Sequence, residues 1–167
     1  LIRDLEMALS DVWGRRLNSV FFGGGTPSLF SASSIDRILT AVRTLMPLEH
    51  FAEVTLEANP GTFEAQKFVD YRLAGINRLS IGIQSFDPNR LKAIGRVHDD
   101  QEALRAVEIA QSNFDAINLD LMYALPGQTL AEAQHDIDTA CAFGVSHLSA
   151  YHLTLEPNTL FHRYPPS

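Results

Sequence analysis

The sequence has a single cysteine, Cys141, and no apolar run of the length needed to cross a membrane. One cysteine excludes an internal disulfide framework, and the chain has no signal-like apolar start. Basic residues are few, with 13 Lys and Arg against 20 Asp and Glu, which gives a formal net charge of −7. We therefore expect a cytoplasmic protein without an integral membrane segment, whose main partner is neither nucleic acid nor an anionic membrane surface.

The residues that are present suit one packed α/β domain spanning residues 1–167, because 46% of them are hydrophobic. Amphipathic or capped helical patterns are found at 5–13, 35–46, about 63–73, about 100–112 and about 130–143. Short runs rich in β-branched and aromatic residues are found at 19–22, 53–58, 78–86, 116–125 and 147–155. This alternation predicts a parallel sheet, either open or curled into a barrel.

Three of the predicted strands have one apolar and one polar face. In "EVTLEAN" the residues Val54, Leu56 and Ala58 alternate with Thr55, Glu57 and Asn59, and "LSIGIQ" and "INLDLM" show the same split. A parallel sheet covered by helices on both sides is apolar on both faces. The split therefore favours a curled sheet, with helices outside and a ligand-lined interior.

Polar side chains cluster where these strands end, which is the site-bearing end of parallel barrels. We expect Glu57, Gln84 and Asp120 to face the concave side, near Gly24 and Thr26. Buried carboxylates need hydrogen-bond partners, which a ligand can supply. The alternative for Glu57 is a partly solvated carboxylate at a strand end, and the alternative for Asp120 is a capping or salt-bridged carboxylate.

Arg96 follows the third predicted strand in "IGRVHDD". If it points inward, its guanidinium suits a carboxylate ligand through paired hydrogen bonds. The alternative is a solvated loop arginine.

The stretch "SVFFGGGTPS" places Gly23, Gly24 and Gly25 directly after a strand. Glycine permits both a tight turn with φ > 0 and the close approach of a ligand. The stretch has neither the Gly-Lys-Ser/Thr of a P-loop nor the G-x-G-x-x-G of a dinucleotide site.

The six histidines lack the spacing of metal ligands, so we predict no metal site among them. His98 and His152 are expected near the mouth of the barrel. Cys141, beside Ile137 and Ala140 in a helical pattern, is interpreted as a buried and inert thiol.

Four motifs, "FFGGGTPS", "LEANPGT", "LSIGIQSFDPNRLKAIGRVH" and "INLDLMYALPGQT", resemble in order and spacing the radical S-adenosylmethionine (SAM) enzymes of the coproporphyrinogen III dehydrogenase type. The resemblance covers essentially the whole chain. "QSFDP" and "GRVH" are more similar to the haem-chaperone branch of that group than to the true dehydrogenases. The resemblance implies a partial parallel (β/α) barrel of the radical SAM type.

The resemblance also implies the ligands. SAM is the expected cofactor, a [4Fe–4S] cluster is expected in the full-length protein, and haem or porphyrin and a haem-acceptor protein are expected partners, with haem a further candidate ligand. No catalytic residue is assigned. The implied cofactor-binding residues are Gly24, Gly25, Thr26, Glu57, Gln84, Arg96 and Asp120.

The sequence departs from the family pattern at two places. The C-x-x-x-C-x-x-C loop that carries the cluster is not in this chain, so we expect the barrel's first strand and the cluster ligands to lie outside it. Ala124 stands where the family usually has glycine. Alanine is awkward there only if the backbone needs φ > 0, and we expect the effect to be minor.

Three functions are compatible with the sequence. The first is a haem chaperone that transfers haem to an acceptor protein. The second is oxygen-independent coproporphyrinogen III oxidation, in porphyrin biosynthesis, by a SAM-derived radical. The third is a barrel that binds an unrelated small ligand. The sequence alone does not distinguish chaperone from oxidase, and it gives neither the haem site nor the oligomeric state.

Overall fold

A computed structural model describes residues 1–62, 65–96 and 100–165. Its five strands form one sheet in the order β1-β2-β3-β4-β5, and every neighbouring pair is parallel. The strands are β1 (Leu17–Phe22), β2 (Leu48–Ala58), β3 (Arg78–Gln84), β4 (Ala116–Tyr123) and β5 (His147–His152). The predicted alternation of strands and helices is confirmed.

Helices connect the strands and flank them. They are α1 (Ile2–Ala8), α2 (Ala32–Leu45), α3 (Ala65–Ala74), α4 (Pro88–Ala93), α5 (Asp100–Gln111), α6 (Leu130–Ala142) and α7 (Leu160–Arg163). Short 3-10 turns lie at Leu9–Asp11, Pro27–Leu29 and Pro60–Thr62. The sequence pattern did not predict α4 or α7, which are short, and the first helix ends at Ala8 rather than continuing to residue 13.

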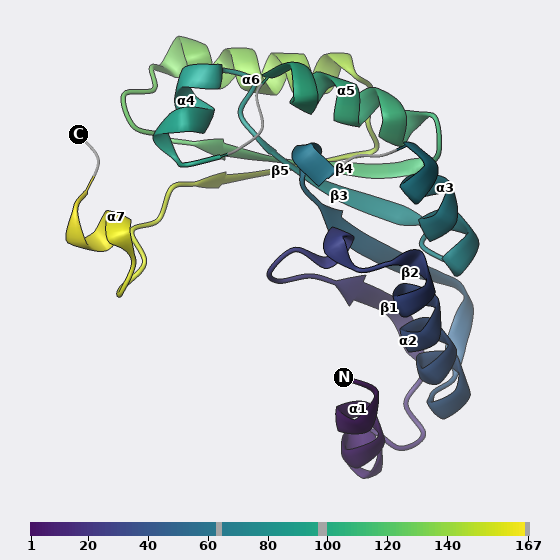
Figure 1. Cartoon of the computed structure of the whole chain (residues 1–167). Coiled ribbons are helices and arrows are strands. Elements are labelled where there is room, and N and C mark those ends of the chain that lie inside the picture. The colour runs from purple at the N-terminus through teal and green to yellow at the C-terminus, as the bar shows by residue number, and fades with distance from the viewer. Residues whose placement is uncertain (63–64, 97–99, 166–167) are drawn as a thin grey trace.

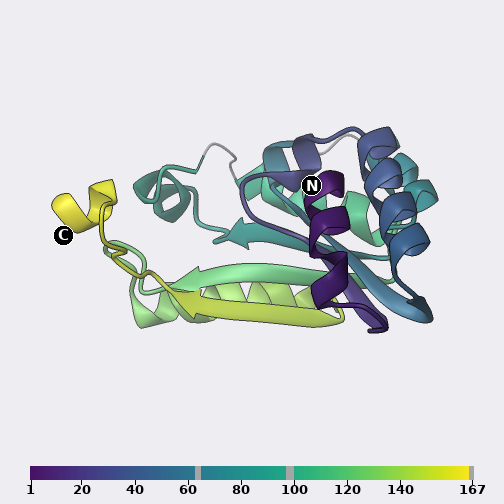
Figure 2. The ribbon, with the colours of Figure 1, turned by 90° about the horizontal axis from the view of Figure 1, so that it is seen from below.

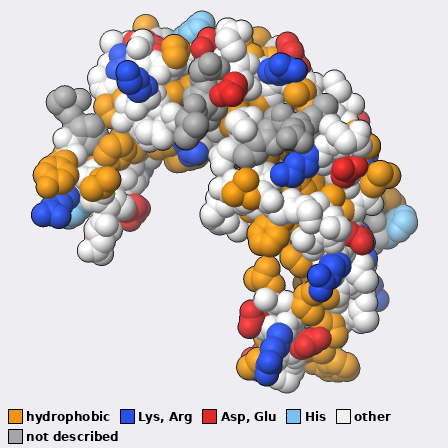
Figure 3. All heavy atoms as spheres, in the orientation of Figure 1, with side chains coloured by type: hydrophobic (Ala, Val, Ile, Leu, Met, Phe, Trp, Pro, Cys, Tyr) orange, Lys and Arg blue, Asp and Glu red, His pale blue; other side chains and the backbone are white. Residues whose placement is uncertain are grey.

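The sheet curls into an arch, with α2 to α6 on its convex side (Figure 1). Viewed from below, the strands run side by side, with α6 behind β4 and β5 (Figure 2). The space-filling view shows the concave side as an open hollow (Figure 3). This curled half-barrel is the predicted partial (β/α) barrel.

The hydrophobic core lies between the sheet and the convex helices. Val54, Leu56 and Leu119 point into it and are at most 3% exposed, as are Phe68 and Val107 from the helices. Because side chains alternate along a strand, the polar neighbours of these core residues must face the hollow. The period-2 pattern thus fixed which residues line the concave side.

Helix ends follow the sequence signals. The Thr129 side chain caps α6 by accepting from the Glu132 backbone N–H, and the Glu132 carboxylate accepts from the Thr129 backbone N–H. The predicted capping box is therefore present. Gly75 and Gly144 follow α3 and α6 with φ of 106° and 64°, the left-handed conformation that ends helices.

Cys141 corrects one expectation. It is exposed, not buried. In α6 only Asp136 and Ala140 are buried, and each residue of an α-helix is turned by about 100° from the one before it. Cys141 therefore points away from the narrow buried stripe.

Strand bounds also differ from the predicted ones. β2 begins at Leu48, five residues before the predicted start, while β3, β4 and β5 each end two or three residues early. Among the described residues, no helix combines the length and apolar character required to span a membrane.

Candidate functional site

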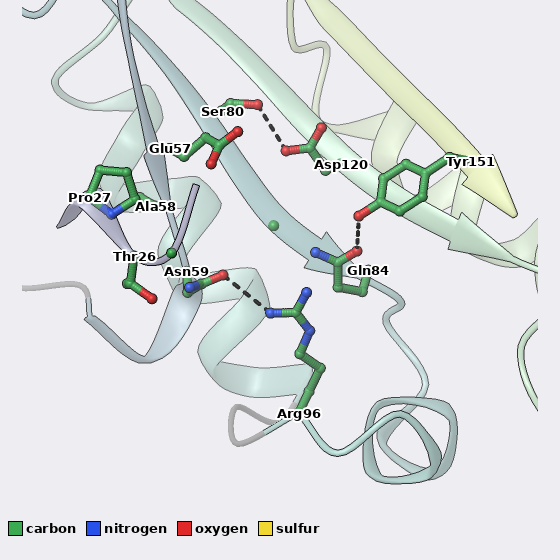
Figure 4. A pocket seen from close by; sticks show the side chains of 12 residues that line it. Thr26, Pro27, Glu57, Ala58, Asn59, Ser80, Gln84, Arg96, Asp120 and Tyr151 are labelled. Carbon is green, nitrogen blue, oxygen red and sulfur yellow. Dashed lines mark hydrogen bonds between the residues drawn. The ribbon is translucent and has the colours of Figure 1, made fainter. Parts of the chain in front are cut away.

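A cavity of about 450 Å³ lies on the concave side, at the carboxyl ends of the strands (Figure 4). Pockets of 300–1,000 Å³ are typical of small-molecule sites. Six of the seven predicted site residues line it, namely Gly25, Thr26, Glu57, Gln84, Arg96 and Asp120. The seventh, Gly24, is hydrogen-bonded to Glu57. The structure therefore brings the predicted residues together.

The structure explains the glycines at 23–25 by two different causes, the backbone conformation at Gly24 and Gly25 and crowding at Gly23. Gly24 and Gly25 have φ of 77° and 63°, and a Cβ at either would meet no atom within 4 Å. Two consecutive left-handed residues favour glycine even where space is free. At Gly23 the reason is crowding, because a Cβ there would lie 2.8 Å from the Phe21 ring and 3.0 Å from Glu57 Oε1.

This turn presents its backbone to Glu57. The Gly24 N–H donates to Glu57 Oε2 over 3.0 Å. Glu57 is half-buried near the carboxyl end of β2, and its carboxylate has more acceptor positions than this one bond uses. Glu57 can therefore accept hydrogen bonds from a cationic or hydroxyl-bearing ligand.

Asp120, on β4, is held by its own neighbours. Ser80 Oγ donates to Asp120 Oδ2 over 2.8 Å, and Asn118 Nδ2 donates to Oδ1 over 2.8 Å. Ser149 Oγ from β5 donates to Asn118 Oδ1 over 3.0 Å. Asp120 thus has partners within the chain, while its acceptor-only oxygens retain capacity for ligand hydroxyls.

Gln84 and Arg96 form the third polar group of the cavity. Gln84 is 3% exposed and accepts a 2.7 Å hydrogen bond from the Tyr151 hydroxyl at Oε1. Arg96 points inward and donates from Nη1 to Asn59 Oδ1 over 3.4 Å. The solvated-loop alternative for Arg96 is therefore wrong. In Figure 4 the other terminal nitrogen of Arg96 and the Gln84 amide nitrogen point toward the same space.

Behind the cavity, Arg90 of α4 fixes the loop that follows β4. Its guanidinium donates to the Pro126 carbonyl and pairs with Glu132 Oε1 at 3.2 Å. A Cβ on Gly127 would lie 2.7 Å from Arg90 Nη1. Glycine at position 127 therefore leaves room for the arginine as well as adopting φ of 65°.

Ala124, in the same loop, corrects a second expectation. Its φ is 56°, so the backbone does adopt the left-handed conformation in which a Cβ is unfavourable. The departure from the family glycine is not minor at this position.

Of the two histidines expected at the mouth, His98 lies outside the described residues. His152 is exposed, and its ring centroid is 6.0 Å from that of Tyr123. Within the described ranges, no group of three or more His, Cys, Asp or Glu is placed to hold a metal ion.

Sequence reasoning missed Asn59, Ser80 and Tyr151, which also line the cavity. Asn59 and Ser80 were on the polar faces already recognised, so the same period-2 signal could have found them. Tyr151 could not be assigned this way, because β5 has no consistently apolar face and all its residues are exposed.

Comparison with known proteins agrees with this fold. Residues 2–140 match the model of the radical SAM superfamily, so the chain belongs to that superfamily. It is 49% identical over 167 residues to "Heme chaperone HemW" of Escherichia coli, covering 99% of this chain and 44% of that protein. It is 40% identical to the protein of the same name from Bacillus subtilis, covering 87% of this chain and 39% of that protein.

Among solved structures, "Coproporphyrinogen III oxidase (HemN) from Escherichia coli is a Radical SAM enzyme" matches with a TM-score of 0.82 at 25% identity. The match covers 93% of this chain and 36% of that one. The chain thus spans less than half the length of the curated relatives it matches. The predicted resemblance to this family is confirmed.

The family implies SAM and a [4Fe–4S] cluster, and the residues present fit these two groups differently. The cavity has donors at Gln84 and Arg96 and acceptors at Glu57 and Asp120, which suits a ligand bearing carboxylate, ammonium and hydroxyl groups. An iron–sulfur cluster needs several thiolates. Cys141 is the one cysteine and is exposed on a convex helix, so this chain does not fit the cluster.

Proposed function

We propose that residues 1–167 form the SAM-binding unit of a radical SAM protein that traffics haem. The observation that carries the proposal is the separation of charge within one cavity, with carboxylates on β2 and β4, the Gln84 amide at the end of β3 and the Arg96 guanidinium after α4. SAM has the complementary groups. A nucleotide would place phosphates beside Glu57 and Asp120, which like-charge repulsion disfavours.

Each cavity residue then has a stated task. Gln84 and Arg96 bind the methionine carboxylate, Glu57 and the Gly24–Thr26 turn bind the ammonium group, and Asp120 accepts from the ribose hydroxyls. The convex core behind the strands keeps these side chains in place, which reduces the ordering cost of binding. In the complete protein SAM would supply the radical chemistry, and the residues of this chain would hold and orient it.

Support for haem trafficking comes from the relatives named as haem chaperones, at 49% and 40% identity. We infer from them that the parent protein binds haem and passes it to an acceptor protein. The second candidate, oxygen-independent coproporphyrinogen III oxidation, is supported by the TM-score of 0.82 to that oxidase. The cytoplasmic location expected from the sequence stays a prediction.

The test of SAM binding is calorimetric titration of SAM into the parent protein loaded with its cluster, as wild type and as Glu57→Gln. Glutamine can still accept from the Gly24 N–H but lacks the charge that pairs with ammonium. Loss of a charged hydrogen bond costs roughly 1–3 kcal/mol, so we expect the Kd to rise about 5- to 150-fold. Equal affinity of both proteins would remove Glu57 from the site.

The test of haem trafficking uses the same cluster-loaded parent. Haem titration followed by mixing with apo-acceptor proteins is expected to show haem binding and transfer. Coproporphyrinogen III incubated with SAM and reductant is expected to remain unconverted. Conversion to protoporphyrinogen without haem transfer would favour the oxidase instead.

A further inference from the structure

The backbone of Gln84 is strained at the point where β3 ends beside the cavity. Its φ is 70°, in the left-handed region that a residue with a Cβ rarely adopts. The Ser85 N–H donates to the Ile83 carbonyl over 2.9 Å, which makes Gln84 the central residue of a three-residue γ-turn. A γ-turn with positive φ at its centre is rare and strained, and it persists only where surrounding contacts hold it.

The same turn interrupts the pairing of β3 with β4. Ile81 is paired with Leu119, and Gln84 is paired with Leu121, so β3 has an extra residue between these two positions. An irregularity of this kind changes the direction of the side chain beside it. Here the Gln84 side chain points into the cavity, where its Oε1 accepts a 2.7 Å hydrogen bond from the Tyr151 hydroxyl (Figure 4). The direction of this side chain therefore depends on the turn.

Asp136 of α6 holds the segment that leaves the turn. Its Oδ2 accepts from Ser85 Oγ, and its Oδ1 accepts from the Phe86 N–H, each over 2.7 Å. Ser85 is fully buried and Asp136 is 2% exposed, so water does not compete freely for these bonds. The carboxylate therefore fixes both residues that directly follow Gln84.

We propose that Asp136 is a positioning residue for the cavity. From the convex side of the sheet, it holds Gln84 in the left-handed turn that directs the Gln84 side chain toward the ligand. Without the carboxylate, the segment after the turn loses its buried acceptor, and the Gln84 backbone is free to return to a negative φ, which moves the side chain away. The inference rests on the proposed SAM function and adds to it a residue from outside the cavity lining.

The test is calorimetric titration of SAM into the cluster-loaded parent as wild type, Asp136→Ala, Gln84→Ala and the double variant. We expect each single variant to raise the Kd about three- to tenfold, the scale of one hydrogen bond. In the Gln84→Ala background, Asp136→Ala should change the Kd by less than about twofold, because the side chain through which it acts is gone.

A conservative variant should rescue binding. In Asp136→Asn the amide oxygen can accept from the Phe86 N–H, and the amide nitrogen can donate to Ser85 Oγ, because a hydroxyl accepts as well as donates. We expect this variant to restore the Kd of SAM to within about twofold of wild type.

Asn77→Ala is the matched control, because Asn77 makes comparable bonds just before the other end of β3. Its Oδ1 accepts from the Val54 N–H over 2.7 Å, and its Nδ2 donates to the Ala52 carbonyl over 2.9 Å. This variant should lower the melting temperature, as Asp136→Ala does, but it should leave the Kd of SAM unchanged.

If Asp136→Ala does not fold, Ser85→Ala replaces it, because it removes one of the two bonds to Asp136, and it should raise the Kd about two- to fivefold. An unchanged Kd in the folded single variants, or a loss that persists in the Gln84→Ala background, would overturn the inference alone. So would an equal loss in Asn77→Ala or in Asp136→Asn. Failure of the wild type to bind SAM would overturn the proposed function, and this inference with it.

Discussion

The Phe86 backbone N–H donates to Asp136 Oδ1 over 2.7 Å, joining the segment after β3 to α6. Ser85 Oγ and Gln128 Nε2 donate to Oδ2 of the same carboxylate, at 2.7 and 3.3 Å. Asp136 is 2% exposed, so it connects the segments that follow β3 and β4 from within the core. Burial raises its pKa, although the bonds from Phe86 and Ser85 oppose the shift.

Asp136→Ala is expected to lower the free energy of unfolding by about 1–3 kcal/mol, because the Phe86 N–H and the Ser85 hydroxyl lose their buried acceptor. Since the folded-state pKa is raised above the ordinary 3.8, the stability that the wild-type carboxyl supplies is fully present below that value and declines as pH rises through the folded pKa. Urea unfolding of both proteins should therefore show a larger difference near pH 4 than at pH 7. A difference that grows with pH would contradict the raised pKa.

Ala124→Gly is expected to stabilise the protein by about 1 kcal/mol. At φ of 56° the alanine Cβ is sterically unfavourable, and removing it gains more free energy than glycine loses through the greater conformational entropy of the unfolded chain. The control is Ala131→Gly in the first turn of α6, where glycine should destabilise by roughly 0.5–1 kcal/mol. Thermal unfolding of the two variants should move in opposite directions. A lower melting temperature for both would show that Ala124 is not strained.

Removing either cavity carboxylate should weaken SAM binding, but the two variants should differ in their effect on the free energy of unfolding. Both Glu57→Ala and Asp120→Ala are expected to weaken SAM binding by roughly 1–3 kcal/mol. Glu57→Ala removes one bond at an exposed turn and should change the unfolding free energy by less than about 0.5 kcal/mol.

Asp120→Ala leaves the Ser80 hydroxyl without its acceptor and takes one of the two acceptors of the buried Asn118 amide nitrogen, which keeps its bond to Ser80 Oγ, so it should cost about 1–3 kcal/mol of stability. Melting curves recorded with the SAM titrations separate the two effects. Unchanged SAM affinity with a lower melting temperature would make Asp120 purely structural.

Anaerobic reconstitution of this chain alone with iron and sulfide is expected to leave no stoichiometric [4Fe–4S] cluster, because Cys141 is its one thiol. Iron content and the visible absorption spectrum measure the outcome. About four irons per chain, retained in Cys141→Ser, would reveal ligands of another kind.

Local patterns predicted much of this site. Alternation along β2, β3 and β4 placed Glu57, Gln84 and Asp120 on one face, because side-chain direction has a fixed period of two. The same pattern could not predict contacts between distant segments. The bonds Tyr151–Gln84 and Phe86–Asp136 join residues 67 and 50 positions apart, and they depend on the curl of the sheet and the packing of α6.

Ala124 and Cys141 show two further limits. The φ of Ala124 belongs to the loop after β4, whose Pro126 carbonyl accepts a hydrogen bond from Arg90, and the helix or strand propensity of alanine does not predict it. Cys141 was predicted to be buried because it lies near apolar residues in the helical pattern. The helix buries only Asp136 and Ala140, so its buried face is narrower than that pattern suggested.

The most direct test of the SAM site is a crystal structure of the cluster-loaded parent protein with SAM bound. We expect the methionine carboxylate within hydrogen-bond distance of Gln84 Nε2 and Arg96, the ammonium group at Glu57, and a ribose hydroxyl at Asp120. SAM bound with its methionine and ribose outside this cavity, or with its carboxylate facing Glu57, would contradict the account.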